Sequence, residues 1–379
     1  MGHKNILRHY SPDEVLYHDA DHFFQSLNSE IRRSQKSIWM EFYTFEFDSI
    51  GKSIIKNLST ASQRGIDVRL IVDGIGSSSL TTQQIRFIKK LGIKLKVHHP
   101  LPWQTSKFAS CSISEFFNSI VNINKRNHRK LCLFDQKILY VGSINMSQLH
   151  SRRFSGDFSW RDNSIRVSGK PADLVKEVFE LSWQGKYSGC RLFGKTLSPR
   201  KSSLRINHTK QLRKYFQNDL LYRLKTARKR IWITTPYFVP DNKILQQLND
   251  AANRGIDVRI LIPRKSDMRY FPLINSLFFR LIKGSGVKIY EYLPTVLHAK
   301  NTIIDDWVLL GSSNLNSRSY RHDLEIDYVP KSQVAKNSII HQFSYDLQQS
   351  RPVELNDIIG RYMVPQIVGP FFKLIRYWL

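Results

Sequence analysis

Two short stretches of the sequence carry the same set of side chains, and this set could act on a phosphate ester. The first is NHRKLCLFDQKILYVGSIN, residues 127–145, and the second is LHAKNTIIDDWVLLGSSN, residues 297–314. Both contain His-x-Lys-x4-Asp followed by Gly-Ser-x-Asn. Chance gives roughly a few hundredths of one such His-Lys-Asp pattern in a chain of this composition, so two in equivalent places indicate a functional motif.

The alternation of apolar residues in both stretches predicts a strand, a tight turn and a return strand. In each motif the histidine and the lysine then point to one face of the strand: His128 with Lys130, and His298 with Lys300. Asp135 and Asp305 close the strand at the turn, a position that suits hydrogen bonding to backbone better than contact with substrate.

The two motifs, brought to one cleft, would present two imidazoles, two ammonium groups and two Asn side chains. This set suits a phosphodiester: one His attacks phosphorus, Lys and Asn donors hold the nonbridging oxygens, and the other His protonates the leaving oxygen. The sequence offers no carboxylate cage for Mg²⁺ or Ca²⁺, and the two lysines would neutralise charge instead. We therefore expect no metal and no cofactor.

Three further segments are repeated in the same order, which predicts how the motifs are positioned. KSIWMEFYTF (36–45) recurs as KRIWITTPYF (229–238), RGIDVRLIVD (64–73) as RGIDVRILIP (254–263), and GIKLKVHHP (92–100) as GVKIYEYLP (286–294). Amphipathic stretches at 52–63 and 242–253 precede the buried β-branched runs VRLIV and VRILI. The repeats predict two duplicated α/β domains, residues 1–190 and 210–360, packed about a pseudo-twofold axis with the active site between them.

The charge balance indicates an anionic partner. The 379 residues include 58 Lys and Arg against 31 Asp and Glu, a net charge of +27. Nucleic acid, an acidic membrane surface and a phosphorylated small substrate all satisfy this excess. Residues 186–214 contain nine basic side chains and no acidic one, and a solvated linker is the alternative interpretation of that segment.

The cysteines and the apolar segments limit the protein class further. Cys111, Cys132 and Cys190 show no CxxC spacing, so neither a disulfide framework nor a zinc site is indicated. The first residues lack the apolar run of a signal peptide, and no apolar stretch reaches the ~20 residues that span a bilayer. We expect at most a peripheral or interfacial protein.

Two segments could contact lipid. The amphipathic tail, residues 361–379, ends in FFKLIRYWL, which at helical spacing separates an apolar face from Lys373 and Arg376. An interfacial helix and a helix docked on its own domain both fit this pattern. Residues 271–282 also repeat apolar positions at helical spacing. Core packing is favoured there over a lipid-facing lip of the cleft.

The paired motifs resemble those of the phospholipase D superfamily, and the surrounding segments resemble its bacterial cardiolipin synthases over residues 12–330. The supporting segments are YTFEFDSIGKSII (43–55), INKRNHRK (123–130), SWRDNSIRVSG (159–169), PYFVPDNKIL (236–245), GVKIYEYLPTVLHAK (286–300) and GSSNLNSRSYRHDLEID (311–327). The resemblance implies two α-β-α sandwich domains and a phosphatidyltransferase that makes cardiolipin from phosphatidylglycerol, or another phospholipid donor, through a phosphohistidine.

The resemblance also implies a place in the cell. Family members often begin with two transmembrane helices, and these are missing from this sequence, as in the shorter, peripheral synthases. We expect a peripheral protein on the cytoplasmic side of the bacterial inner membrane, bound to anionic phospholipid such as phosphatidylglycerol.

The resemblance assigns roles to individual residues. His128 becomes the nucleophile, and His298 the general acid and base. The groups that bind phosphoryl oxygens are Lys130, Lys300, Asn145 and Asn314, with Ser143 and Ser312 in the same loops. Ser143 stands where many synthases have a second Gly. Asp162 and Glu325 match the carboxylates that fix the histidine tautomers, and surface ion pairs with Arg161 and Arg321 are the alternative.

Two other classes remain open at this point. One is a phosphodiesterase or nuclease of the same superfamily, because a net charge of +27 would also hold a DNA backbone. The other is a non-catalytic module that binds lipid or nucleic acid, although the two intact motifs argue against it. Strand cleavage without a lipid product would identify the nuclease.

Overall fold

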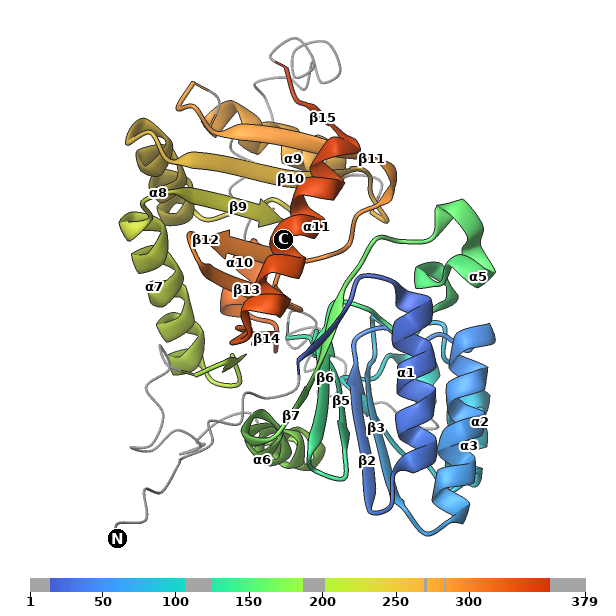
Figure 1. The fold of residues 1–379 in the computed structure, drawn as a ribbon. Helices are drawn as coiled ribbons and strands as arrows, with labels where there is room; N and C mark the ends of the chain where they lie inside the picture. Colours follow the sequence, from blue (N-terminus) through green and yellow to red (C-terminus); the bar gives the residue numbers. More distant parts are fainter. Residues whose placement is uncertain (1–13, 106–124, 187–201, 269–270, 283, 355–379) are drawn as a thin grey trace, which may run out of the picture.

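The computed structural model describes residues 14–105, 125–186, 202–268, 271–282 and 284–354. Within these residues the chain forms two mixed sheets, each with helices packed on its faces (Figure 1). The predicted tail, Cys111, Cys190 and most of the basic 186–214 segment lie outside the described residues. Cys132 is a buried free thiol.

The first sheet has seven strands in the order β1-β7-β6-β5-β2-β3-β4. Its strands are β1 (Val15–Tyr17), β2 (Ser37–Phe42), β3 (Asp67–Asp73), β4 (Lys94–His98), β5 (Lys130–Phe134), β6 (Ile138–Gly142) and β7 (Ser164–Ser168). The longer helices of this half are α1 (Ala20–Arg33), α2 (Ser49–Gln63), α3 (Thr82–Lys90) and α6 (Lys170–Gln184). The short α5 (Arg152–Ser155) lies between β6 and β7.

The second sheet repeats this order and adds one strand at its edge: β8-β14-β13-β12-β9-β10-β11-β15. Its strands are β8 (Leu204–Ile206), β9 (Arg230–Thr234), β10 (Asp257–Lys265), β11 (Lys288–Val296), β12 (Asn301–Ile304), β13 (Trp307–Gly311), β14 (Ile326–Tyr328) and β15 (Ser350–Pro352). Its helices are α7 (Lys210–Thr226), α8 (Asn242–Asn253), α9 (Phe271–Ile282), α10 (Ser317–Arg321) and α11 (Gln333–Gln348). The duplicated α/β fold is therefore confirmed.

Three apolar clusters hold these layers together. One packs the first sheet against α1, α2 and α3, and a second packs the other sheet against α7, α8 and α9. The third contains residues of both sheets together with α6 and α11, so the two halves share a core. Equivalent aromatic pairs lie in it: Trp39 stacks on Phe179 at 5.1 Å and Trp232 on Phe343 at 5.0 Å. Burial of such rings contributes about 2 kcal/mol each.

Polar side chains cap the two repeated helices, and the amphipathic stretches predicted at 52–63 and 242–253 lie within them; α2 begins three residues earlier than its stretch. Asp48 caps α2 by accepting from the backbone N–H of Gly51, and Asp241 caps α8 by accepting from that of Ile244. The 271–282 segment is a helix whose Phe278, Phe279 and Ile282 are buried in the core. Core packing, the favoured interpretation, holds for these residues, and Phe271 at the start of the helix belongs to the same core and also lines the cleft described below.

Candidate active site

Each motif histidine lies just before an equivalent strand and is held there by backbone of the opposite half. The N–H of His128, before β5, donates to the carbonyl of Leu324 at 3.0 Å. The N–H of His298, before β12, donates to the carbonyl of Arg161 at 2.8 Å. Leu324 and Arg161 immediately precede Glu325 and Asp162 in the chain, so the same contacts bring these carboxyl groups to the histidines.

The carboxyl groups bind the histidines in a crossed arrangement. Nδ1 of His128 lies 3.1 and 3.0 Å from the two carboxyl oxygens of Glu325, in the second half. Nδ1 of His298 lies 2.6 Å from Oδ2 of Asp162, in the first half. Nε2 of each ring is therefore the nitrogen available to substrate, and each half needs the other to complete its histidine.

Asp162 and Glu325 are buried, which excludes the alternative of surface ion pairs. The guanidinium of Arg161 pairs instead with Asp346 at 3.1 Å. Loop serines hold the second side of each carboxyl group: Ser143 donates to Oδ1 of Asp162 and Ser312 donates to Oε2 of Glu325. The motif serines thus lie behind the carboxylates.

The two motif lysines are buried beside the histidines. Nζ of Lys130 donates to the carbonyl oxygen of His128 at 2.7 Å. Nζ of Lys300 donates to the carbonyl oxygen of His298 at 2.5 Å and lies 3.1 Å from its Nε2. Burial and mutual repulsion lower the pKa of Lys130 to about 7, and burial lowers the pKa of Lys300 to about 8. An incoming phosphate would favour the ammonium forms of both.

The motif aspartates lie at the turns, away from the cleft. Asp135 accepts hydrogen bonds from the backbone N–H groups of residues 35–37, the shortest at 2.7 Å. Asp305 accepts from those of residues 228–230 in the same way. Both residues have positive φ, 49° and 54°, a conformation that Asp tolerates. The position of Asp135 and Asp305 at the turns had predicted that they bond to backbone rather than contact substrate.

A cleft with a volume of about 520 Å³ runs between the halves. Four of the predicted residues line it: His128, Asn145, His298 and Asn314. Phe271, from the segment for which a lip of the cleft was the alternative interpretation, lines it too. Other lining residues were not foreseen from the sequence, and they include Tyr43, His150, Trp160, Tyr237 and Arg318. The aromatic walls suit the apolar part of a lipid, and Arg318 adds a cation that pairs with Asp323 at 2.9 Å.

The two histidine environments differ in charge. Burial, followed by the charges of Lys130 and Lys300, lowers the pKa of His128 well below its usual value. Burial raises the pKa of Glu325 to about 7. Burial acts in the same direction on Asp162, but the neighbouring His298 and His150 outweigh it and lower the pKa of this carboxyl group. His298 therefore faces an ionised carboxylate, and His128 a carboxyl group that is easily protonated.

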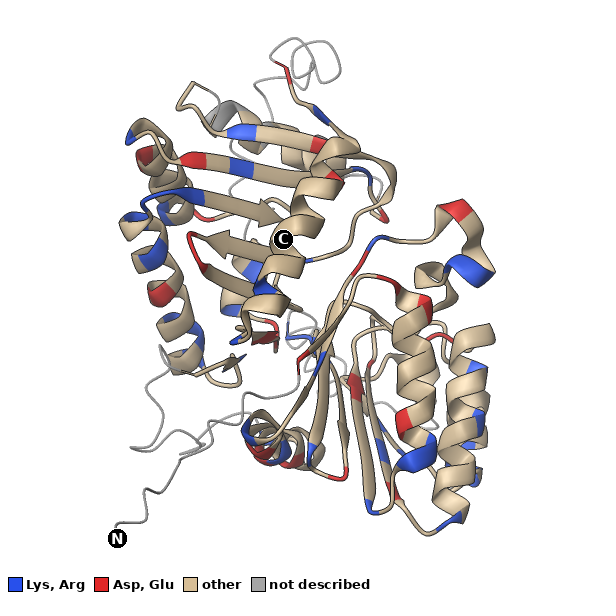
Figure 2. Cartoon of the chain, in the orientation of Figure 1, with Lys and Arg blue, Asp and Glu red and all other residues tan. Residues whose placement is uncertain are grey.

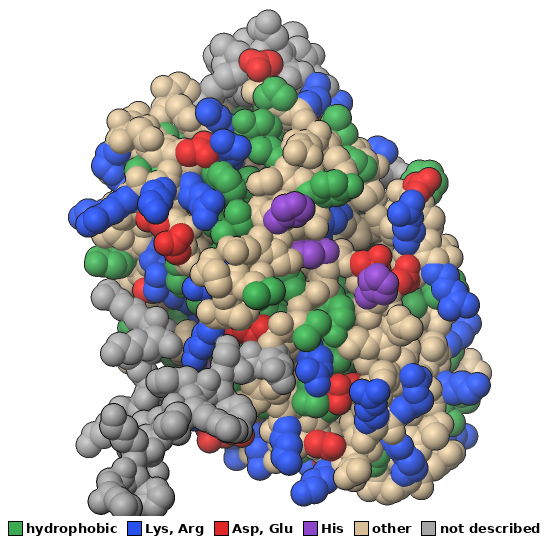
Figure 3. Space-filling model, in the orientation of Figure 1, with side chains coloured by type: hydrophobic (Ala, Val, Ile, Leu, Met, Phe, Trp, Pro, Cys, Tyr) green, Lys and Arg blue, Asp and Glu red, His purple; other side chains and the backbone are tan. Residues whose placement is uncertain are grey.

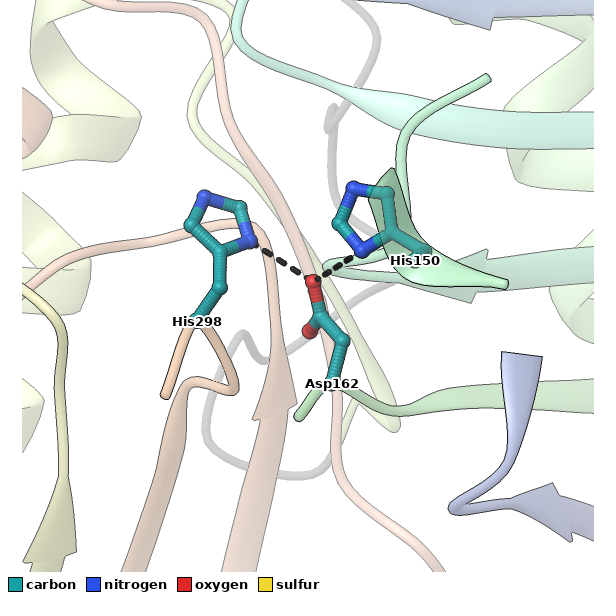
Figure 4. Close-up of side chains that lie close together, drawn as sticks. All are labelled: His150, Asp162 and His298. Carbon is teal, nitrogen blue, oxygen red and sulfur yellow. Dashed lines mark hydrogen bonds and ion pairs between the residues drawn. The ribbon is translucent and has the colours of Figure 1, made fainter. Parts of the chain in front are cut away.

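Among the described residues, His150, Asp162 and His298 form a cluster of types that could also bind a metal (Figure 4). One donor atom of each lies within 4.8 Å of the others. The 2.6 Å distance between Nδ1 of His298 and Oδ2 of Asp162 is that of a charge-assisted hydrogen bond. His298 and Asp162 are therefore placed to hold a proton between them.

The fold itself is phospholipase D-like. The phosphatidylserine synthase of Haemophilus influenzae Rd KW20 superposes with a TM-score of 0.66 at 13% identity, covering 97% of this chain and 95% of that one. The family model described as "Cardiolipin synthase, PLD-like domain" matches residues 27–155 and 220–347.

Two curated relatives extend this likeness over most of the sequence. The cardiolipin synthase of Clostridium perfringens strain SM101 is 30% identical, covering 96% of this chain and 76% of that protein. That of Halalkalibacterium halodurans is 28% identical, covering 93% and 69%. The chain belongs to the cardiolipin synthase family of phosphatidyltransferases, with its phospholipase D-like domain present twice.

Proposed function

We propose that this enzyme makes cardiolipin by moving a phosphatidyl group from phosphatidylglycerol, or another phospholipid donor, to a second phosphatidylglycerol through His128. The observation that carries the proposal is the crossed pairing of His128 with Glu325 and His298 with Asp162 at one cleft. This pairing leaves two Nε2 atoms for the two steps of a double displacement.

In the first step Nε2 of His128 attacks phosphorus, and the bond from phosphorus to the headgroup oxygen breaks. His298 gives its proton to that oxygen, and the small alcohol leaves. In the second step His298 takes the proton from the acceptor hydroxyl. The resulting oxygen attacks phosphorus, and the phosphorus–nitrogen bond breaks, which restores His128.

The charge difference between the two carboxyl groups supports this division of roles. The pKa of Asp162 is lowered by His298 and His150 against the effect of burial, so its ionised form stabilises the imidazolium that a general acid needs. Burial lowers the pKa of His128, and its neutral ring is the form that attacks phosphorus. Lys130 and Lys300 stand beside the rings to balance the charge of the phosphoryl oxygens.

The substrate lipid must reach the cleft from a membrane, and we propose that the cleft mouth docks on an anionic bilayer. Support comes from one segment around α5, in which Leu149, Phe154 and Phe158 are 44%, 46% and 80% exposed. Leu149 also lines the cleft, and Arg152 and Arg153 are exposed beside the rings. Insertion of the rings and attraction of the arginines to phosphate would act together.

No helix in the described ranges is long and apolar enough to cross a membrane. The proposed location is the cytoplasmic face of the bacterial inner membrane, where phosphatidylglycerol is the anionic partner.

One assay tests the function. Purified protein is incubated with phosphatidylglycerol vesicles, with and without phosphatidylethanolamine, and the lipids are analysed by mass spectrometry. We expect cardiolipin with release of glycerol, and none from the His128→Ala variant. Phosphatidic acid alone would indicate a phospholipase, and DNA strand cleavage without a lipid product would indicate the nuclease.

A further inference from the structure

His150 is a third buried histidine beside the catalytic pair, and the two-step reaction above does not use it. It ends the 3₁₀ turn Gln148–His150. Its ring centroid lies 5.8 Å from that of His298 and 5.1 Å from that of Trp160, which also contacts His298. The ring is fixed within the wall of the cleft.

One hydrogen bond to the His150 ring determines its tautomer. The backbone N–H of Asn145 donates to Nε2 of His150 at 3.4 Å, so in the neutral ring the proton is on Nδ1. That Nδ1 lies 3.3 Å from Oδ2 of Asp162, close enough for an electrostatic contact but without the alignment of a hydrogen bond, and it has no hydrogen-bond partner among the described residues (Figure 4). Oδ2 of Asp162 therefore faces two imidazole N–H groups, those of His298 and His150.

The second half has a serine at the equivalent position. Ser319 follows Asn314 by five residues, as His150 follows Asn145, and its Oγ likewise accepts from the Asn backbone N–H, at 3.1 Å. Ser319 donates to Oε1 of Glu325 at 2.7 Å. The two carboxyl groups thus have different second donors, an imidazole on Asp162 and a hydroxyl on Glu325.

We propose that His150 is a positioning residue for His298: it shares Oδ2 of Asp162 with His298, holds that oxygen in place and weakens its pull on the His298 proton. This inference rests on the proposed function, which gives His298 its acid and base role. Because burial lowers the pKa of His150 to about 3, the ring stays neutral and acts on Asp162 through the dipole of its Nδ1–H group, 3.3 Å from Oδ2. The other titratable groups that act on this cluster are Lys300, Lys130, Asp267 and His128.

Two variants of His150 separate the effect of its N–H group on Asp162 from the effect of its packing. His150→Ala removes the second N–H donor, so Asp162 becomes more basic toward His298. We expect the pKa of His298 to rise by about one unit, the scale of one hydrogen bond to an ionised group, and the alkaline limb of kcat/KM to move up with it. His150→Asn can place an amide N–H where Nδ1 lies, and should return the pKa most of the way to the native value.

The measurement is an NMR titration of the protein with labelled histidine, the His298 signal being assigned with the His298→Ala variant, together with the pH profile of cardiolipin formation. A His298 pKa that does not change in His150→Ala would overturn the proposal, even if activity falls. Equal shifts in the Ala and Asn variants would do the same. The titration needs no turnover, so its result does not depend on whether the enzyme makes cardiolipin.

Discussion

At the scale of single residues, the two motif histidines occupy equivalent positions in unlike environments. Asp162 faces two imidazoles and one serine hydroxyl, whereas Glu325 faces one imidazole and two serine hydroxyls. A carboxylate held ionised favours a protonated partner. His128 can attack through Nε2 only while its ring proton lies on Nδ1, and the ionised form of Glu325 is the acceptor for that proton. Burial lowers the pKa of both histidines, but the ionised Asp162 opposes this shift at His298, which suits His298 better than His128 to acid catalysis.

This asymmetry predicts unequal effects of neutralising the carboxyl groups. Asp162→Asn removes the charge that stabilises protonated His298, and we expect kcat/KM to fall about 100-fold at pH 7, the scale of general acid catalysis. Glu325→Gln should cost about 10-fold or less, because the Gln amide oxygen can still accept from Nδ1 of His128 and burial already raises the pKa of the native carboxyl group to about 7. Rates measured on the same vesicles test this, and a larger loss in Glu325→Gln would reverse the assigned roles.

The sequence could predict the residue types of the site but not this pairing. His128 and Glu325 are 197 positions apart, and His298 and Asp162 are 136 apart, so no local pattern links them. His150 could have been found, because it follows Asn145 at the spacing at which Ser319 follows Asn314. Such an alignment of His150 with Ser319 is not suggested by their residue types. It becomes evident only in the structure, where each side chain lies against the carboxyl group of its site.

At the scale of elements, each motif aspartate bonds its hairpin, β5–β6 or β12–β13, to the neighbouring strand, β2 or β9. Each carboxylate accepts from three successive backbone N–H groups at the start of β2 or β9. Alternation in the sequence predicted both hairpins, and the positive φ of Asp135 and Asp305 explains why an Asp stands at each turn.

The hairpin contacts predict a loss of stability that depends on pH. Burial alone would raise the pKa of Asp135, but the backbone donors outweigh it, so the folded pKa lies below the usual 3.8. The contribution is present above that unfolded value and is lost as pH falls through the folded one. Asp135→Asn should therefore lower the free energy of unfolding by about 1 kcal/mol at pH 7, since the site is partly exposed.

Urea unfolding of Asp135→Asn at a series of pH values measures this difference, and Asp305→Asn serves as its counterpart in the other half. The difference in the free energy of unfolding between the variant and the native protein should decrease toward zero near pH 3. A difference that does not change with pH would mean that the charge of the carboxylate does not stabilise the hairpin.

The segment around α5 predicts a separate effect on membrane binding (Figure 1). Replacing Phe154 and Phe158 by Ser removes exposed rings without touching the core, so binding to anionic vesicles should fall about 10-fold or more while the thermal transition stays in place. Val334→Ser on α11, at a side chain that is also 80% exposed, is the matched control. Equal binding by both variants and the native protein would remove this segment from the docking surface.

At the scale of the whole molecule, the two halves form one catalytic unit. A shared apolar core joins the sheets, and the crossed contacts make each histidine depend on the opposite half. The internal repeats predicted two equivalent domains facing one cleft. They could not predict the cleft walls, because Tyr43, Trp160 and Tyr237 lie in repeated or family-like segments whose pattern does not show which side chains meet, and these three come together only through tertiary packing.

The charge of the molecule predicts how docking responds to salt. Lys and Arg side chains are spread over both halves, as Figures 2 and 3 show, with a total excess of +27. Each basic residue near the headgroups contributes roughly 1 kcal/mol, and salt screens this attraction. Cosedimentation should therefore increase with phosphatidylglycerol content and decrease from low to high salt. Binding that is indifferent to lipid charge would assign the basic surface to another partner.

The central claim is that His128 carries the phosphatidyl group while His298 serves the leaving oxygen. The most direct measurement uses a phosphatidyl ester of p-nitrophenol, whose leaving group needs no protonation, and compares the two histidine variants by rapid mixing and peptide mass spectrometry. The account predicts that His298→Ala releases a burst of one p-nitrophenolate per enzyme and retains a phosphatidyl adduct on His128, whereas His128→Ala gives neither. A burst from His128→Ala, or an adduct on His298 instead, would contradict it.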